Sequence, residues 1–347
     1  MTGVQTCALP ISFAELREFL RVNGLYVFTI NGFPYGPFHG TRVKEDVYLP
    51  DWQDEERLRY TNLLADLLAA LLPAGVDGSV STVPGAFRAR VQGRDTVARM
   101  ASLMIRHAAH LVRLREETGH TIALALEPEP CCFLETIDET VGFFESWLFS
   151  AQAGQQLAAE TGLQGDAAEE ALRRHLGVCL DLCHAAVEFE DRRAIASRLH
   201  DAGIRIAKMQ LSAGLQVPAV TPQAAARLRA FADDVYLHQV VEANGAGFKR
   251  YVDLPEALAQ LGDNGKREWR IHFHVPVFLE DLGDFLSTQS FLRDVLHQHH
   301  ARPISPHLEI ETYTWDVLPE PYRSEDVVSA VVRELDWVVS ELSTPKP

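Results

Sequence analysis

The chain has 347 residues, 47% of them hydrophobic, so it can bury a large core as one domain of barrel size or as two smaller ones. Its 48 acidic and 32 basic residues give a net charge of −16, which argues against nucleic-acid partners and anionic membranes. No run reaches the ~18 apolar residues that a membrane span needs, so no integral membrane segment is expected.

Nothing in the sequence points to secretion. The opening MTGVQTCALPIS lacks the basic start and long apolar stretch of a signal peptide, and it resembles a translated sequencing adapter. We therefore predict a non-native tail at residues 1–12 and a single domain at residues 13–347. The five cysteines are odd in number and form no paired CxxC spacing, which favours a reduced, cytoplasmic protein with cysteines that pack as small core residues.

From residue 13 onward, short apolar runs alternate with longer segments of helical period, a pattern typical of repeated βα units and a parallel sheet. A short helix is predicted first, at residues 13–23. Seven strands are predicted after it, at residues 25–30, 76–83, 121–127, 177–183, 204–211, 269–275 and 307–313.

Three further elements lie between these strands. The clearest helix covers residues 94–118 and ends at Gly119. Another begins after Thr136, where the sequence TIDE has the form of a capping box. Residues 236–254 contain two strand-like runs around a glycine-rich turn, which predicts an inserted hairpin.

The element order predicts an α/β fold. Seven βα units behind a helix remnant suggest a (β/α)8 TIM barrel whose first strand is missing or replaced at the N-terminus. A doubly wound open sheet would alternate in the same way, but no GxGxxG follows the first strand and no P-loop is present.

Four of the strands carry an apolar set of side chains on one face and an ionisable set on the other. The ionisable sets reach Glu127, Asp181, His274 and Glu311 near the carboxyl ends of their strands, where barrel active sites lie. Carboxylates that point at one another repel unless a cation or a shared proton compensates. A divalent metal ion, Mn²⁺, Mg²⁺, Co²⁺ or Zn²⁺, is the simplest compensation.

Several longer stretches carry a family resemblance. They are YVFTINGFPYGPFHG, VYLPDW, STVPGAF, EPEPCCFLET, LDLCHAAVEFE, YLHQVV and HLEIETYTW. These stretches resemble the EboE-type metabolite traffic proteins, a likeness that spans nearly everything from residue 13. More broadly, the chain is similar to the xylose-isomerase-like TIM barrels, a superfamily of sugar isomerases, epimerases and endonuclease IV.

The resemblance implies a metal held at strand ends by Glu127, Asp181, Gln210 and Glu311, with His184 binding the substrate. Gln210 departs from the pattern, because sugar epimerases place a histidine there. His274, on another predicted strand, would supply the missing nitrogen. The Ebo-type context implies a sugar-like or cyclitol-like metabolite and partners from the same pathway.

The first functional hypothesis is a metal-dependent isomerase or epimerase in which Glu127 and Glu311 move protons. Its expected substrate-binding residues are His184, Lys208, His272, Asn31 and Tyr35, the last two in an aromatic loop at residues 31–40 that would close over the site. One alternative is a phosphoester hydrolase of the endonuclease IV-like branch, disfavoured by the acidic charge and few inward histidines. The other is a non-catalytic metabolite-binding or carrier barrel, for which Gln210 is the best support.

Overall fold

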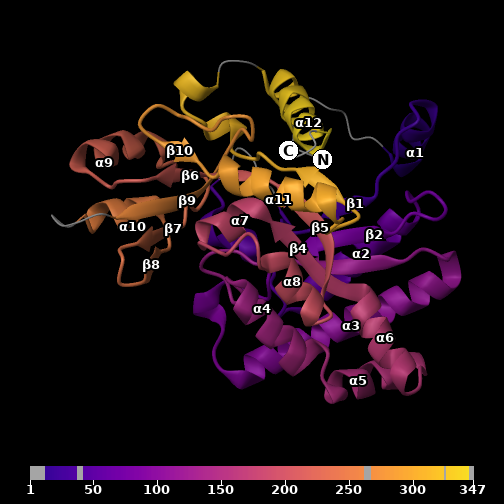
Figure 1. Ribbon diagram of the computed structural model, residues 1–347. Coiled ribbons are helices and arrows are strands. Elements are labelled where there is room, and N and C mark those ends of the chain that lie inside the picture. The colour runs from indigo at the N-terminus through magenta and orange to yellow at the C-terminus, as the bar shows by residue number, and fades with distance from the viewer. Residues whose placement is uncertain (1–11, 37–41, 262–266, 324–325, 344–347) are drawn as a thin grey trace. The chain divides into compact units, whose positions relative to one another are not determined.

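The computed structural model describes residues 12–36, 42–261, 267–323 and 326–343 (Figure 1). Of the predicted tail, only Ser12 falls within these ranges, and its side chain caps the first helix. The chain forms two compact units, each assembled from separate segments. Unit 1 comprises Met1–Glu127, Val141–Cys179 and Ala202–Lys208, and unit 2 comprises Pro128–Thr140, Leu180–Asp201 and Met209–Pro347.

A parallel sheet begins in unit 1. Its strands are β1 (Thr29–Asn31), β2 (Gly78–Thr82), β3 (Ile122–Leu126), β4 (Leu176–Asp181), β5 (Arg205–Leu211) and β11 (Leu308–Ile310). They are hydrogen-bonded in the order β1-β2-β3-β4-β5-β11, and the strands β4 and β5 begin in unit 1 and end in unit 2. This parallel βα arrangement confirms the predicted α/β class and agrees with a (β/α)8 barrel.

The two faces of the sheet in unit 1 differ as predicted. Its helices are α1 (Phe13–Val22), α2 (Glu55–Ala69), α3 (Arg94–Thr118), α5 (Ala151–Thr161) and α6 (Asp166–His175). Ile122 packs with Leu68 of α2 and Leu111 of α3 in one core cluster. The neighbouring Ala123 and Ala125 belong to another cluster, with Cys179 and Ala207. Side-chain alternation along β3 therefore follows the predicted register.

Two helix ends also follow their predicted signals. The helix α3 has the predicted bounds and ends at Gly119, whose φ of 79° lies in the left-handed region. The helix α4 (Ile137–Phe143) begins with the predicted capping box. There the Glu139 backbone N donates to Thr136 Oγ1 at 3.2 Å, and the Thr136 backbone N donates to Glu139 Oε2 at 3.3 Å.

Unit 2 contains a second sheet. Its strands are β6 (Ala213–Val217), β7 (Val240–Ala243), β8 (Phe248–Tyr251), β9 (Glu268–Val275) and β10 (Leu286–Ser287), in the order β10-β6-β9-β7-β8. The strands β7 and β8 pair antiparallel and confirm the predicted hairpin. The strand at residues 269–275 was wrongly assigned to the parallel sheet, because β9 runs antiparallel to both β6 and β7. Apolar alternation identifies a strand but does not choose its partners.

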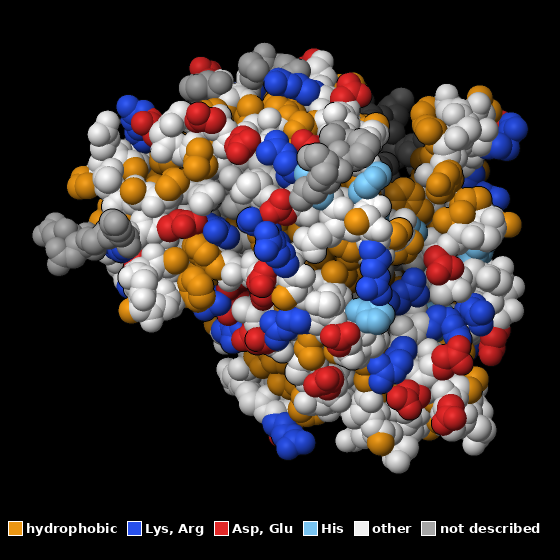
Figure 2. All heavy atoms as spheres, in the orientation of Figure 1, with side chains coloured by type: hydrophobic (Ala, Val, Ile, Leu, Met, Phe, Trp, Pro, Cys, Tyr) orange, Lys and Arg blue, Asp and Glu red, His pale blue; other side chains and the backbone are white. Residues whose placement is uncertain are grey.

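The helices of unit 2 are α7 (Leu182–Val187), α8 (Ile195–Asp201), α9 (Pro222–Leu228), α10 (Leu254–Ala259), α11 (Gln289–Ala301) and α12 (Val327–Ser343). None of the helices in the described ranges is both long enough and apolar enough to cross a bilayer. On the surface drawn in Figure 2, basic side chains are interspersed with acidic ones. The four described cysteines are buried, and Cys179 and Cys183 pack in hydrophobic clusters as predicted.

Candidate metal centre

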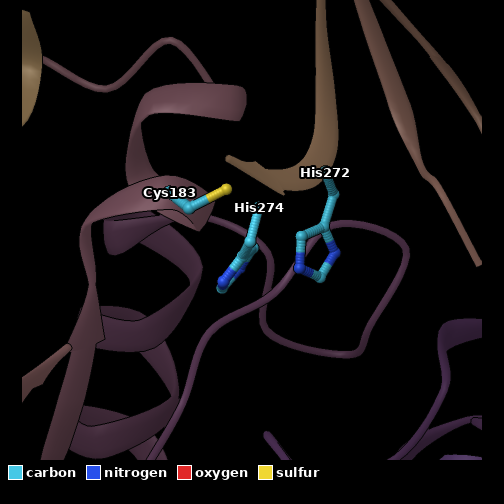
Figure 3. A group of neighbouring side chains, drawn as sticks. All are labelled: Cys183, His272 and His274. Atoms are coloured by element: carbon cyan, nitrogen blue, oxygen red, sulfur yellow. The ribbon is translucent and has the colours of Figure 1, made fainter. Parts of the chain in front are cut away.

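Five ionisable side chains of unit 2 are buried close together. Asp181 ends β4, His184 lies in the first turn of α7, and Glu129 lies in the loop after β3. His272 and His274 lie two residues apart on β9, so both project from the same face of that strand (Figure 3). Each of the five side chains is at most 5% exposed.

Asp181 has one committed oxygen and one uncommitted oxygen. Its Oδ1 accepts hydrogen bonds from the His184 backbone N at 3.0 Å and from Ser212 Oγ at 2.7 Å. Its Oδ2 has no hydrogen-bond partner among the described residues and lies 3.9 Å from His184 Nε2. Burial alone would raise the pKa of Asp181, but the His184 and His274 rings and these two donors lower it below its usual value. The carboxylate is therefore ionised at neutral pH.

His274 presents a nitrogen lone pair. Its Nδ1 lies 2.8 Å from the backbone carbonyl oxygen of Glu311, which can only accept, so Nδ1 carries the hydrogen and Nε2 does not. That Nε2 is buried and has no partner in the described part of the chain. Burial lowers the pKa of His274 to about 4, which keeps the ring neutral at pH 7. A neutral imidazole anchored through Nδ1–H is the usual form of a metal-binding histidine.

His184 and His272 are anchored in the same way. His184 Nδ1 donates to the Pro128 carbonyl oxygen at 3.0 Å, and His272 Nδ1 donates to Gln239 Oε1 at 2.8 Å. The orientation of the Gln239 amide is fixed, because its Nε2 donates to Glu129 Oε1 at 3.2 Å. The two Nε2 atoms lie 3.0 Å apart. Burial and the neighbouring rings lower the pKa of His272 well below its usual value, so that ring is neutral.

Three groups of side chains in unit 2 bring potential metal ligands within 4.8 Å of one another. They are Asp181, His184 and His274; Glu129, His184 and His272; and Cys183, His272 and His274. Figure 3 shows the third group. Its thiol is the weakest candidate, since Cys183 packs with Val187 and Val241, and burial raises its pKa well above the usual value. The imidazole and carboxylate groups in these sets are donors that fit a divalent cation.

Unit 1 holds four of the predicted site residues. Glu127 is 3% exposed at the end of β3, and its backbone N donates to the Thr82 carbonyl oxygen at 3.1 Å. The Nζ atom of the fully buried Lys208 lies 3.4 Å from Ser81 Oγ. Ser81 Oγ in turn donates to Asn31 Oδ1 at 3.1 Å. Asn31 and Lys208, predicted separately as substrate-binding residues, thus share one partner.

The fourth, Tyr35, lies at the surface. Its side chain is 43% exposed, and its hydroxyl donates to Glu56 Oε1 at 2.9 Å. Residues 37–40 of the predicted aromatic loop fall outside the described ranges.

The remaining predicted ligands lie in unit 2. Gln210 is fully buried on β5, in register with Glu309 of β11. Glu311 is half-buried just after β11, and its backbone N donates to the Leu211 carbonyl oxygen at 3.2 Å. Unit 2 therefore brings together Asp181 and the three histidines, while the carbonyl group of Glu311 orients His274.

Two residues of this cluster were missed from the sequence. Glu129 stands in the stretch EPEPCCFLET, but its burial and its hydrogen bond to Gln239 were not foreseen. Gln239 stands in the stretch YLHQVV, which carried the family resemblance, but no spacing rule marked it as an anchor for His272. Their roles depend on a contact between segments 110 residues apart.

No protein-family model matches the chain, and no curated protein sequence matches it significantly. Among solved structures, the chain is similar to the 3-keto-D-glucoside 4-epimerase YcjR from E. coli, with a TM-score of 0.43, 14% identity, and coverage of 94% of this chain and 84% of the other. A xylose isomerase-like TIM barrel protein from Mycobacterium smegmatis in complex with magnesium gives a TM-score of 0.47 and 13% identity, with coverage of 97% of this chain and 79% of the other. The IolI protein with a bound zinc atom gives a TM-score of 0.43 and 13% identity, with coverage of 96% of this chain and 82% of the other. Because these TM-scores and sequence identities are low, the site has to be judged from its own geometry.

Proposed function

We propose that the protein is a divalent-metal-dependent isomerase or epimerase acting on a sugar-like or cyclitol-like metabolite. The supporting observation is the pair of buried atoms Asp181 Oδ2 and His274 Nε2, which have no hydrogen-bond partner among the described residues. Burying a charged oxygen and a ring nitrogen without partners is unfavourable, and a bound cation would satisfy both.

The proposed ligands are Asp181 and His274, together with Glu127, Gln210 and Glu311 from the strand-end prediction. His274 would supply the nitrogen that Gln210 lacks. A divalent cation bound there would polarise a substrate carbonyl and the adjacent hydroxyl as a Lewis acid. This polarisation makes the neighbouring C–H bond more acidic, as isomerisation or epimerisation by proton transfer requires.

The protein's own groups would then move the proton. Of Glu127 and Glu311, one removes a proton from the carbon next to the carbonyl, and the other returns a proton. Lys208 and Asn31, linked through Ser81, would hold substrate oxygens. His184, His272 and Tyr35 complete the proposed substrate-binding set. The EboE-type context, partners from the same pathway and a cytoplasmic location remain predictions.

One observation favours a second candidate, a phosphoester hydrolase. The sequence suggested few inward histidines, but three of them meet in unit 2. Histidine-rich sites suit zinc and other hydrolytic metals. The carrier alternative still rests on Gln210.

Solvent deuterium exchange tests the proposed reaction even while the substrate is unidentified. Chelated protein is reloaded with Mn²⁺ and incubated in D2O with a panel of aldoses, ketoses and cyclitol ketones. We expect deuterium on the carbon next to the carbonyl of at least one compound, measured by mass spectrometry. Glu311→Gln should abolish this exchange while Mn²⁺ is kept at saturating concentration.

The controls separate the three candidate functions. Tyr35→Phe, which alters a half-exposed surface side chain, should retain the fold and the metal affinity. Hydrolysis of a phosphate ester by the loaded protein, with no exchange into any carbonyl compound, would replace the isomerase proposal with the hydrolase. Neither reaction, despite bound metal, would favour the carrier.

A further inference from the structure

The imidazole rings of His184 and His272 in unit 2 face each other through their Nε2 atoms. His184 and His272 both use Nδ1–H as a donor, to Pro128 O and Gln239 Oε1. In the neutral form of both rings, each Nε2 atom therefore carries a lone pair, and these two atoms lie 3.0 Å apart. Two neutral rings in this arrangement repel each other at a hydrogen-bonding distance. A positive charge between or beside the two nitrogens would remove that repulsion.

The surroundings of the pair fit a divalent cation. Glu129 contributes a buried carboxylate, and it forms one ligand group with the two histidines, in which the potential ligand atoms lie within 4.8 Å of one another. Two imidazole nitrogens bound to a tetrahedral zinc at the usual bond lengths would lie about 3.3 Å apart, close to the separation seen here.

We propose that His184, His272 and Glu129 bind a second divalent cation, beside the position assigned to Asp181 and His274. The proposal deepens the proposed function, since it adds a second ion to the same centre. Two imidazoles and one carboxylate suit Zn²⁺ or Co²⁺ better than Mg²⁺. Because 3.9 Å separates His184 Nε2 from Asp181 Oδ2, the two ions would lie close enough to act on one substrate.

Two further side chains hold this second position in shape. Gln239 accepts from His272 and donates to Glu129, so it fixes the ring tautomer and the carboxylate together. The hydroxyl of Tyr313 lies 3.3 Å from His272 Nε2, and burial raises its pKa well above the usual value, which keeps it protonated. Both are positioning residues.

Metal stoichiometry tests the proposal on the full chain. Chelated protein is dialysed against Zn²⁺, and bound zinc per chain is measured by elemental analysis, with Co²⁺ absorption spectra as a second readout. We expect two equivalents for the unaltered protein. His272→Asn and Glu129→Gln should each retain one, and Asp181→Asn should retain the other. His175→Asn, in which a buried and anchored histidine of unit 1 is replaced, is the matched control and should retain two.

The outcomes separate this proposal from the proposed function. One equivalent that is lost in Asp181→Asn and kept in His272→Asn overturns the second cation and leaves the first intact. One equivalent lost in His272→Asn and kept in Asp181→Asn supports the histidine site and counts against the proposed function. Binding that both variants abolish, or no binding at all, overturns the second site. If a variant fails to fold, the stoichiometry of the unaltered chain still decides between one ion and two.

Discussion

Buried histidines occur in both units, but they are arranged differently. In unit 1, His175 Nδ1 donates to the Ile122 carbonyl oxygen at 2.7 Å, and His107 Nδ1 lies 2.6 Å from Asn62 Oδ1. Each leaves a buried Nε2 without a hydrogen-bond partner among the described residues, as His274 does in unit 2. No potential ligand group in the described ranges includes either unit 1 ring, whereas three such groups include unit 2 rings. Anchoring through Nδ1 is therefore common to both units, and unit 2 differs in that its rings lie within 4.8 Å of other potential metal ligands.

The largest expected effect comes from Asp181→Asn. Asparagine keeps the N-cap of α7 but removes the charge that faces His274, so the fold should persist. A bound zinc ion would lose its charged partner, and removing one partner of a buried charged pair costs about 3–5 kcal/mol, which corresponds to roughly a 10²–10⁴-fold loss of zinc affinity. Isothermal titration of the chelated protein measures this loss. An affinity unchanged from that of His175→Asn would remove Asp181 from the site.

Acid titration should show that His175 of unit 1 affects stability without binding metal. Burial lowers the pKa of His175 to about 4 from its ordinary 6.5. Between these pH values the unfolded state binds more protons than the folded state, so the free energy of unfolding falls as the pH drops through this window. The full shift is worth about 3 kcal/mol. Urea unfolding of metal-free protein at pH 7 and pH 5 should show a weaker pH dependence for His175→Gln.

Repeating the urea unfolding with added Zn²⁺ sharpens the comparison between the two units. Added Zn²⁺ should stabilise His175→Gln as much as the unaltered protein at pH 7, because binding to the native state alone raises stability. A reduced zinc effect in this variant would place His175 in the metal site and break the distinction between the units.

A smaller effect is expected from Gln239→Leu. The leucine cannot accept from His272 or donate to Glu129, so the ring and the carboxylate lose their shared anchor. Loss of such an outer partner typically lowers metal affinity by about 10–100-fold. Competition with a chromophoric chelator should show the loss for one of the two zinc ions. Equal weakening of both ions would mean that Gln239 supports the fold generally.

The smallest effect should come from Tyr313→Phe. This change removes one hydroxyl beside His272 Nε2 and keeps the ring, whose centroid lies 4.5 Å from that of His274. A single neutral hydrogen bond is worth about 1 kcal/mol, so zinc affinity should change by less than about tenfold in either direction. A change above 100-fold in the same competition assay would make Tyr313 a ligand.

Local signals in the sequence predicted much of the fold. Alternation along β3 separated Ile122 from Ala123, and the bounds of α3 followed from its apolar period and the glycine at its end. The partners of β9 could not be predicted. It pairs with β6 on one side and β7 on the other, and both strands are distant from it in sequence.

The candidate site was predicted only in part. Asp181 and His274 were identified because each lies on the polar face of its own strand. The facing Nε2 atoms of His184 and His272 come from residues 88 apart, and their tautomers depend on Pro128 and Gln239. No periodicity encodes such hydrogen bonds.

Nitrogen NMR of the imidazole rings tests the central claim most directly. Chelated, ¹⁵N-labelled protein at pH 7 should show neutral, Nδ1-protonated rings for His184, His272, His274 and His175. On addition of Zn²⁺, the Nε2 signals of the three unit 2 rings should shift, and that of His175 should not. Rings in unit 2 that are protonated at Nε2, or Nε2 signals there that do not shift on addition of Zn²⁺, would contradict the assignment of these histidines to a metal centre.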